Sequence, residues 1–186
     1  MDLFDAIYTR QSIGVVQLEG IPHEMVERLL NAAAQAPNHH RVRPWRFVVL
    51  TGKAREQLGE VLAQSLLKRN PDSTEAQVDL ERKRPLRAPL LIAVGIDKPD
   101  QPIVIEIENV CAGAASVQNL LLAAHDLGLA AMWRTGTAAY DPDVKNFLGF
   151  EAEQHVIAFV YVGFPRQEPK PVERPSFSDR TIWMED

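Results

Sequence analysis

The segment "IVIEIENVCAGAASVQNLLLAAHDL" (residues 103–127) says more about the fold than any other stretch of this 186-residue sequence. Its first half is rich in β-branched residues, whereas its centre, "CAGAAS", consists of small side chains. Small side chains let a helix approach its neighbours closely. Such a helix is typical of a protein core or of a subunit interface, so we expect it at the centre of a homodimer.

The segments on either side alternate between helical and extended patterns. Apolar residues at spacings of three and four predict helices, and β-branched apolar runs bounded by Gly or Pro predict strands. They do not alternate as strict βαβ units, which favours an α+β fold with a largely antiparallel central sheet surrounded by helices. One domain should span residues 1–186, with an extended arm from about residue 166. Expected helices cover 2–9, 22–36, 54–67 and 141–149, a polar helical excursion covers 71–87, and expected strands cover 46–52, 88–96, 128–136 and 155–165.

Composition excludes several classes of protein. Hydrophobic residues make up 46% of the chain and charged residues 24%, as in a globular domain. The net charge of −5 argues against a nucleic-acid binder, and the basic run "ERKRPLR" (81–87) reads as a solvated helix end. Nothing approaches the roughly 18 apolar residues of a membrane span. The acidic N-terminus does not resemble a signal peptide, and the lone Cys111 reads as core filler, so we expect a cytoplasmic protein without metal-binding cysteines.

The stretch "APNHHRVRPW" (36–45) raises the question of a metal site, because His39 and His40 are adjacent. Metal-binding helices space their histidines three or four residues apart, as in H-E-x-x-H, and that motif is absent. The sequence also lacks G-x-S-x-G, G-x-G-x-x-G and the P-loop pattern, so the common hydrolase, dinucleotide and ATP sites lack support. We therefore predict no metal ligands.

Three polar loops remain at helix and strand ends: "RQS" (10–12), "NHHRVRPW" (38–45) and "WRTG" (133–136). An arginine and a serine just after a helix can hold a phosphate through charge-assisted hydrogen bonds. Aromatic rings, imidazoles and backbone amides suit a flat heterocycle that needs hydrogen bonds around its edge. The combination points to flavin mononucleotide (FMN).

These loops also carry a resemblance to a known family. The stretches "YTRQS" (8–12), "APNHHRVRPWRFVVL" (36–50), "GLAAMWRTG" (128–136) and "VYVGFP" (160–165) resemble, in order and separation, the motifs of the nitroreductase family of FMN oxidoreductases, and within it a compact branch. The resemblance covers nearly the whole chain and implies a homodimer with FMN at the subunit interface.

The resemblance also implies roles for individual residues. Arg10, Gln11 and Ser12 would contact FMN, with Arg10 and Ser12 holding the ribityl phosphate region. Gln35 and His39 would reach the flavin bound mainly to the other subunit. The stretch around His39 would then be a cofactor clamp donated across the dimer interface.

At the third loop the resemblance implies that Trp133, Arg134 and Thr135 line the isoalloxazine ring near N5. No dedicated acid or base is expected, because the flavin carries the chemistry. For Trp45 we favour core packing. His40 and Arg41 could be exposed loop residues or part of a substrate channel.

Two departures from the family pattern bear on charge. Many relatives carry basic residues shortly after the serine, where this sequence has Gly14 and Val15. Many also place a phosphate-binding basic residue after the last strand, and here Arg166, Arg174 and Arg180 are all candidates. Arg10, Arg134 or an arginine of the arm would have to supply the positive charge beside a reduced flavin.

The function implied is an FMN-dependent oxidoreductase that takes electrons from NADH or NADPH and reduces nitroaromatic, quinone or related acceptors by a ping-pong mechanism. An alternative is a non-catalytic flavin carrier or sensor. A structural dimer without any cofactor is a third reading. The sequence does not decide the physiological acceptor or the choice between NADH and NADPH.

Overall fold

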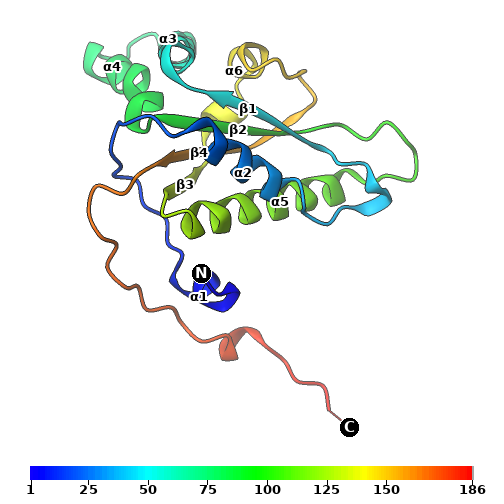
Figure 1. Ribbon diagram of the computed structural model, residues 1–186. Coiled ribbons are helices and arrows are strands. Elements are labelled where there is room, and N and C mark those ends of the chain that lie inside the picture. Colours follow the sequence, from blue (N-terminus) through cyan, green and yellow to red (C-terminus); the bar gives the residue numbers. More distant parts are fainter. Residues whose placement is uncertain (186) are drawn as a thin grey trace.

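The computed structural model describes residues 1–185 and has the α+β fold expected from the sequence (Figure 1). Six α-helices and four strands lie within these residues, together with four short 3-10 turns at His39–Arg41, Arg84–Arg87, Thr137–Ala139 and Ser178–Arg180. The helices are α1 (Leu3–Thr9), α2 (His23–Ala33), α3 (Gly52–Arg69), α4 (Glu75–Lys83), α5 (Glu106–Asp126) and α6 (Pro142–Phe147). The strands are β1 (Trp45–Leu50), β2 (Leu90–Ile96), β3 (Ala130–Arg134) and β4 (His155–Gly163).

The four strands form one sheet in the order β1-β2-β4-β3, and every pair is antiparallel. All seven residues of β2 are buried, because both faces of the sheet are covered by helices. Leu91 and Ala93 pack in a cluster with α3 and α6, whereas Ile92 and Val94 pack in a cluster with α2 and α5. The predicted antiparallel sheet is therefore confirmed, with β1 and β3 at its edges.

Helix α5 lies against the sheet through the small residues that the sequence places at its centre. A Cβ atom added to Gly113 would lie 2.1 Å from Cδ1 of Ile96, so no larger residue fits there without movement. Ala112 and Ser116 are buried on the same face. The small residues thus serve packing within the chain. Cys111 lies on the opposite, exposed face, so its interpretation as core filler is wrong.

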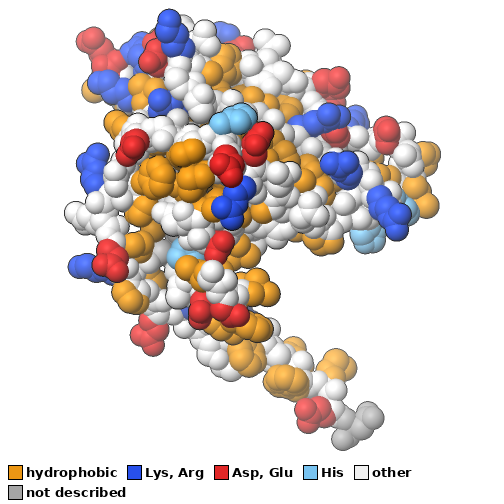
Figure 2. Space-filling model, in the orientation of Figure 1, with side chains coloured by type: hydrophobic (Ala, Val, Ile, Leu, Met, Phe, Trp, Pro, Cys, Tyr) orange, Lys and Arg blue, Asp and Glu red, His pale blue; other side chains and the backbone are white. Residues whose placement is uncertain are grey.

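The N-terminal segment crosses the start of β3 and then follows the end of β4. Ser12 forms a single parallel bridge with Ala131, and Val16 forms an antiparallel bridge with Pro165. Beyond this point α1 and the C-terminal arm project from the body of the molecule (Figure 1). Hydrophobic side chains gather on this projection (Figure 2).

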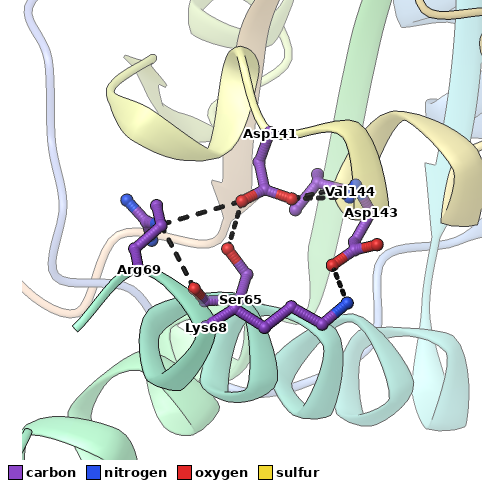
Figure 3. Close-up of polar contacts among 6 residues, drawn as sticks. All are labelled: Ser65, Lys68, Arg69, Asp141, Asp143 and Val144. Carbon is purple, nitrogen blue, oxygen red and sulfur yellow. Dashed lines mark hydrogen bonds and ion pairs between the residues drawn. The ribbon is translucent and has the colours of Figure 1, made fainter. Parts of the chain in front are cut away.

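A polar cluster joins α3 to α6 and fixes the segment that follows β3 (Figure 3). Asp141 is buried and caps α6, accepting hydrogen bonds from the backbone amides of Asp143 (2.9 Å) and Val144 (3.2 Å). Its other carboxylate oxygen accepts a hydrogen bond from the Ser65 hydroxyl. The Lys68–Asp143 ion pair (2.5 Å) lies at the exposed rim of the cluster.

Replacing Asp141 by alanine should destabilise the fold by about 2–4 kcal/mol, because the helix loses its cap and the buried Ser65 hydroxyl loses its partner. Urea denaturation measures the effect. Asp143→Ala is the matched control, since it removes a carboxylate that is paired only at the surface, and it should change the urea midpoint little. Equal effects of the two substitutions would show that the buried cap has no special weight.

Candidate functional site

Three basic side chains converge where α1, α5 and the C-terminal arm meet. Arg10 is the residue that ends α1, and the guanidinium of Arg174 donates a hydrogen bond to its backbone carbonyl. His125, in the last turn of α5, lies 2.7 Å from the Thr9 hydroxyl through its Nε2 atom. We call Arg10, Arg174 and His125 the cationic cluster.

The cationic cluster lacks a carboxylate to neutralise its arginines. Within residues 1–185, neither Arg10 nor Arg174 has an acidic partner within ion-pair distance. Burial and the charge of Arg174 lower the pKa of Arg10. Burial and the charge of Arg10 lower the pKa of His125, and Asp126 opposes this shift. Like charges held together in this way favour a bound anion with several acceptor oxygens, such as a phosphate.

The residues that follow Arg10 tie this cluster to the sheet. The Gln11 side chain donates to the backbone carbonyl of Lys170 (2.7 Å) and so holds the arm beside α1. Ser12 is exposed and bridges Ala131 in β3. The predicted site residues Arg10, Gln11 and Ser12 therefore lie together at the start of β3, next to the arm.

Arg134 and Thr135 lie at the other end of β3, on the rim of a cavity of about 340 Å³. We call it the β3 cavity. Strand β3 rises roughly 3.3 Å per residue, which puts Thr135 about 13 Å along the strand from Ala131. The cavity is lined by Leu58 and Leu62 of α3, Arg84, the turn 134–136, Phe159 and Tyr161 of β4.

Trp133 points to the opposite face of the sheet from the β3 cavity. Its indole packs with the α2 and α5 cluster, and Nε1 donates to the backbone carbonyl of Ile157 (2.9 Å). Its one polar atom is therefore satisfied within the chain, and only its ring surface remains for other contacts. Trp45 is buried, in agreement with the core-packing interpretation.

Gln35 and His39 are not brought to either end of β3 within the chain. Gln35 lines a hollow beneath α1, and His39 lines another along the outer face of α5. The His39 ring lies 3.3 Å from Glu108 and is largely exposed. The two residues present polar groups on the surface around α5, separate from the β3 cavity.

The loop that carries His39 is strained. His40, Arg41 and Arg43 have φ angles of 52°, 56° and 51°, a region that residues with a Cβ atom rarely adopt. The Asn38 side chain accepts a hydrogen bond from the backbone amide of Arg43 (2.9 Å) and closes the loop. Strain of this kind often accompanies binding surfaces. His40 and Arg41 are exposed there.

Neither metal binding nor a membrane span finds support in the described part of the chain. No three histidine, cysteine or acidic side chains within residues 1–185 gather as a metal site would require. Among the same residues, no helix has the length and apolar character needed to cross a membrane.

Sequence reasoning missed three residues near the predicted site. The basic run 81–87 reads as a solvated helix end, which holds for the exposed Lys83 and Arg87. The interpretation as a solvated helix end is wrong for Arg84, which lines the β3 cavity. Tyr161 and His125 carry no local signal, because each belongs to an ordinary strand or helix pattern and gains its neighbours only through the fold.

Comparisons with known proteins agree with this architecture. The model of the nitroreductase family matches residues 7–164. The candidate NAD(P)H nitroreductase YdjA of Escherichia coli K12 is 28% identical over 166 residues, covering 89% of this chain and 90% of that protein. A nitroreductase-like protein from Bacillus cereus has the same fold, with a TM-score of 0.86, 23% identity and coverage of 100% and 97% of the two chains.

Another solved structure, at higher identity, is a complex with a flavin. It is a candidate nitroreductase from Desulfovibrio desulfuricans in complex with FMN, 26% identical, with a TM-score of 0.75 and coverage of 98% of this chain and 96% of that one. The family model spans most of the chain, and the resemblance noted in the sequence is confirmed. With its antiparallel sheet, its bridged N-terminal segment and a match over residues 7–164, the chain belongs to the nitroreductase family.

Proposed function

We propose that this chain is an FMN-dependent oxidoreductase that uses NADH or NADPH to reduce nitroaromatic, quinone or related small acceptors in a ping-pong cycle. The observation that carries the proposal is that the cationic cluster and the β3 cavity lie at the two ends of β3. The cationic cluster suits a phosphate, and the rim of the β3 cavity lies about the length of the strand away from it. A relative described as an FMN complex and another named for NAD(P)H support the choice of cofactor and reductant.

The donor set at the cationic cluster fits the phosphate of FMN. Two guanidiniums without carboxylate partners in the described chain, together with a serine hydroxyl, match a dianion with three acceptor oxygens. Arg10, Arg174 and Ser12 would hold the phosphate end, with His125 beside them. Gln11 would keep the arm in place through its bond to Lys170.

Of the three arm arginines that the sequence leaves open, Arg174 has the strongest structural support. It alone hydrogen-bonds to Arg10. Arg166 donates its backbone amide to Val15, and Arg180 pairs with the neighbouring Asp179 in an exposed position. We therefore assign the phosphate contact of the arm to Arg174.

At the other end of β3, Thr135 and Arg134 would lie against the isoalloxazine ring. FMN, when bound, supplies the chemistry, by accepting a hydride from NADH or NADPH and passing electrons to the second substrate. The protein binds and orients the reactants. Thr135 offers a backbone amide at the strand end, and Arg134 adds positive charge that favours a reduced ring. One domain of 186 residues would hold the cofactor.

If Arg10 and Arg174 contact the phosphate, Arg10→Ala and Arg174→Ala should each weaken FMN binding by about 1.5–3 kcal/mol. This is the cost of losing a charge-assisted hydrogen bond. Riboflavin, which lacks the phosphate, should bind both variants about as well as the native protein. Fluorescence titration of the two flavins measures this difference. Arg180→Ala is the control and should bind both flavins normally. Equal losses for FMN and riboflavin would place these arginines away from the phosphate.

We also propose that the site is completed in a homodimer. Leu3, Phe4 and Tyr8 of α1 are 61–70% exposed, and Trp183 of the arm is 73% exposed. Clusters of exposed apolar side chains often mark interaction surfaces, and here they lie on the projection seen in Figure 2. Gln35 and His39, which lie apart from the β3 cavity of their own chain, would then contact the flavin of the partner.

Light scattering should therefore find a dimer. Phe4→Glu should shift it toward monomer and lower FMN affinity together, because a carboxylate on α1 would be buried at the interface. Leu80→Glu is the matched control, since Leu80 is 54% exposed on α4 and lies outside the proposed interface. A native monomer that carries bound FMN would contradict the dimer proposal.

The enzymatic proposal is tested by adding NADH or NADPH to the FMN-loaded protein without oxygen. The flavin absorbance should bleach, and a nitroaromatic or quinone should then restore it. Initial-rate plots with both substrates should give parallel lines, as in a ping-pong cycle. A bound flavin that neither nucleotide bleaches would instead indicate a carrier or sensor. A protein that stays colourless with added FMN would rule out both.

A further inference from the structure

The β3 cavity combines an apolar floor with cationic and hydroxyl walls. Leu58, Leu62 and Phe159 supply the apolar surface, and Arg84, Arg134 and Tyr161 supply the polar groups. A volume of about 340 Å³ lies at the lower end of the range for small-molecule sites. The cavity is therefore suited to one aromatic ring with small substituents.

Arg84 has hydrogen-bonding capacity that the chain does not use. Its Nη2 atom pairs with Glu81 at 2.5 Å. Its Nε atom is buried and meets no acceptor within residues 1–185. Buried donors of this kind are rare in folded proteins. The Arg84 guanidinium thus has a single acidic partner, Glu81, and its exposed part lines the cavity.

Unlike Arg84, the other two polar groups of the cavity have no acidic partner in the described chain. Arg134 forms no ion pair within the described chain, and its Nε atom lies 3.1 Å from the sulfur of Met132. None of the hydrogen bonds found in residues 1–185 uses the Tyr161 hydroxyl. Burial raises the pKa of Tyr161 despite the nearby arginines, so the phenol stays protonated at neutral pH and can donate a hydrogen bond.

The charge balance at the cavity is positive. Arg84 and Arg134 line the cavity, and Arg87 lies near enough to act on Tyr161. Among the described residues whose charges shift the pKa of this phenol most, Glu81 is the carboxylate, and it is already paired with Arg84. An anionic group placed between Arg84, Arg134 and Tyr161 would therefore meet two positive charges and a hydroxyl donor.

We propose that the β3 cavity is the acceptor pocket and that it selects single-ring aromatic acceptors bearing a carboxylate. The ring would rest on Phe159 and the two leucines of α3, and the carboxylate would bind Arg84, Arg134 and the Tyr161 hydroxyl. This inference rests on the proposed function, because Thr135 on the cavity rim is the residue assigned to the flavin ring.

The test compares 4-nitrobenzoate with 4-nitrobenzamide, which has nearly the same shape but no charge. The FMN-loaded protein should show a KM for 4-nitrobenzoate lower by about tenfold or more, the effect of a charge-assisted hydrogen bond. Benzoate, which cannot be reduced, should perturb the flavin spectrum on binding, whereas benzamide should require far higher concentrations. The benzoate titration reports binding independently of turnover.

Two variants and a control locate the effect. Arg84→Gln should remove the preference by raising the KM for 4-nitrobenzoate far more than that for 4-nitrobenzamide, and it should leave the FMN dissociation constant unchanged. Tyr161→Phe, which keeps the ring and removes only the hydroxyl, should reduce the preference severalfold and remains informative if Arg84→Gln does not fold. Lys83→Gln removes the same charge from the exposed neighbouring residue and should leave the preference intact.

The outcomes separate this inference from the proposed function. If both nitro compounds are reduced with equal KM values, the acceptor inference is wrong and the oxidoreductase proposal stands. If the flavin is never bleached by NADH or NADPH, the proposed function itself fails. If Arg84→Gln weakens FMN or riboflavin binding without changing the KM ratio, the cavity belongs to the flavin ring, and the acceptor inference is overturned.

Discussion

The open outer edge of β3 is the constraint on which the proposed site depends. β3 pairs along its length only with β4, and on its other side the described chain contributes a single bridge from Ser12 to Ala131. Unpaired strand edges are normally covered or charged, because they invite association. Here the two ends of the edge carry the cationic cluster and the β3 cavity. A cofactor and a partner subunit lying along this edge would cover it, and would bring acceptors to Arg10, Arg174 and Arg134, which have no acidic partner in the described chain.

Basic side chains lie at both ends of this edge, but in different surroundings. At the start of β3, burial and, to a smaller extent, the charge of Arg174 lower the pKa of Arg10, so the two guanidiniums lie together at a cost. At its end, Arg84 keeps a buried donor unsatisfied. In the proposed site, anionic ligands of different kinds would balance these positive charges, a phosphate at one end and a carboxylate at the other. The α3–α6 cluster around Asp141 ties α3, which supplies Leu58 and Leu62 to the cavity wall, to the segment that follows β3.

The sequence predicted individual helices and strands well wherever a local pattern of apolar residues is enough to identify the element. The apolar runs of β2 and β4 and the helical spacing of α2 identify these elements locally. What local patterns cannot predict is which face meets which neighbour. The small residues of α5 pack on the sheet of their own chain, and Cys111 is exposed, because Gly113 must approach Ile96. Likewise Arg84 looks like Lys83 in the sequence, and only the packing of α4 against α3 turns it inward. Gln35 and His39 would reach a flavin only in the proposed dimer, which no single-chain pattern specifies.

The central claim is that FMN lies along the outer edge of β3, with its phosphate at the cationic cluster and its ring against Thr135, at the rim of the β3 cavity. A crystal structure of the FMN-loaded protein tests it most directly. The claim predicts that the phosphate contacts Arg10 and Arg174 and that the ring contacts the backbone at Thr135. A flavin bound elsewhere, or bound with its phosphate away from both arginines, would contradict it.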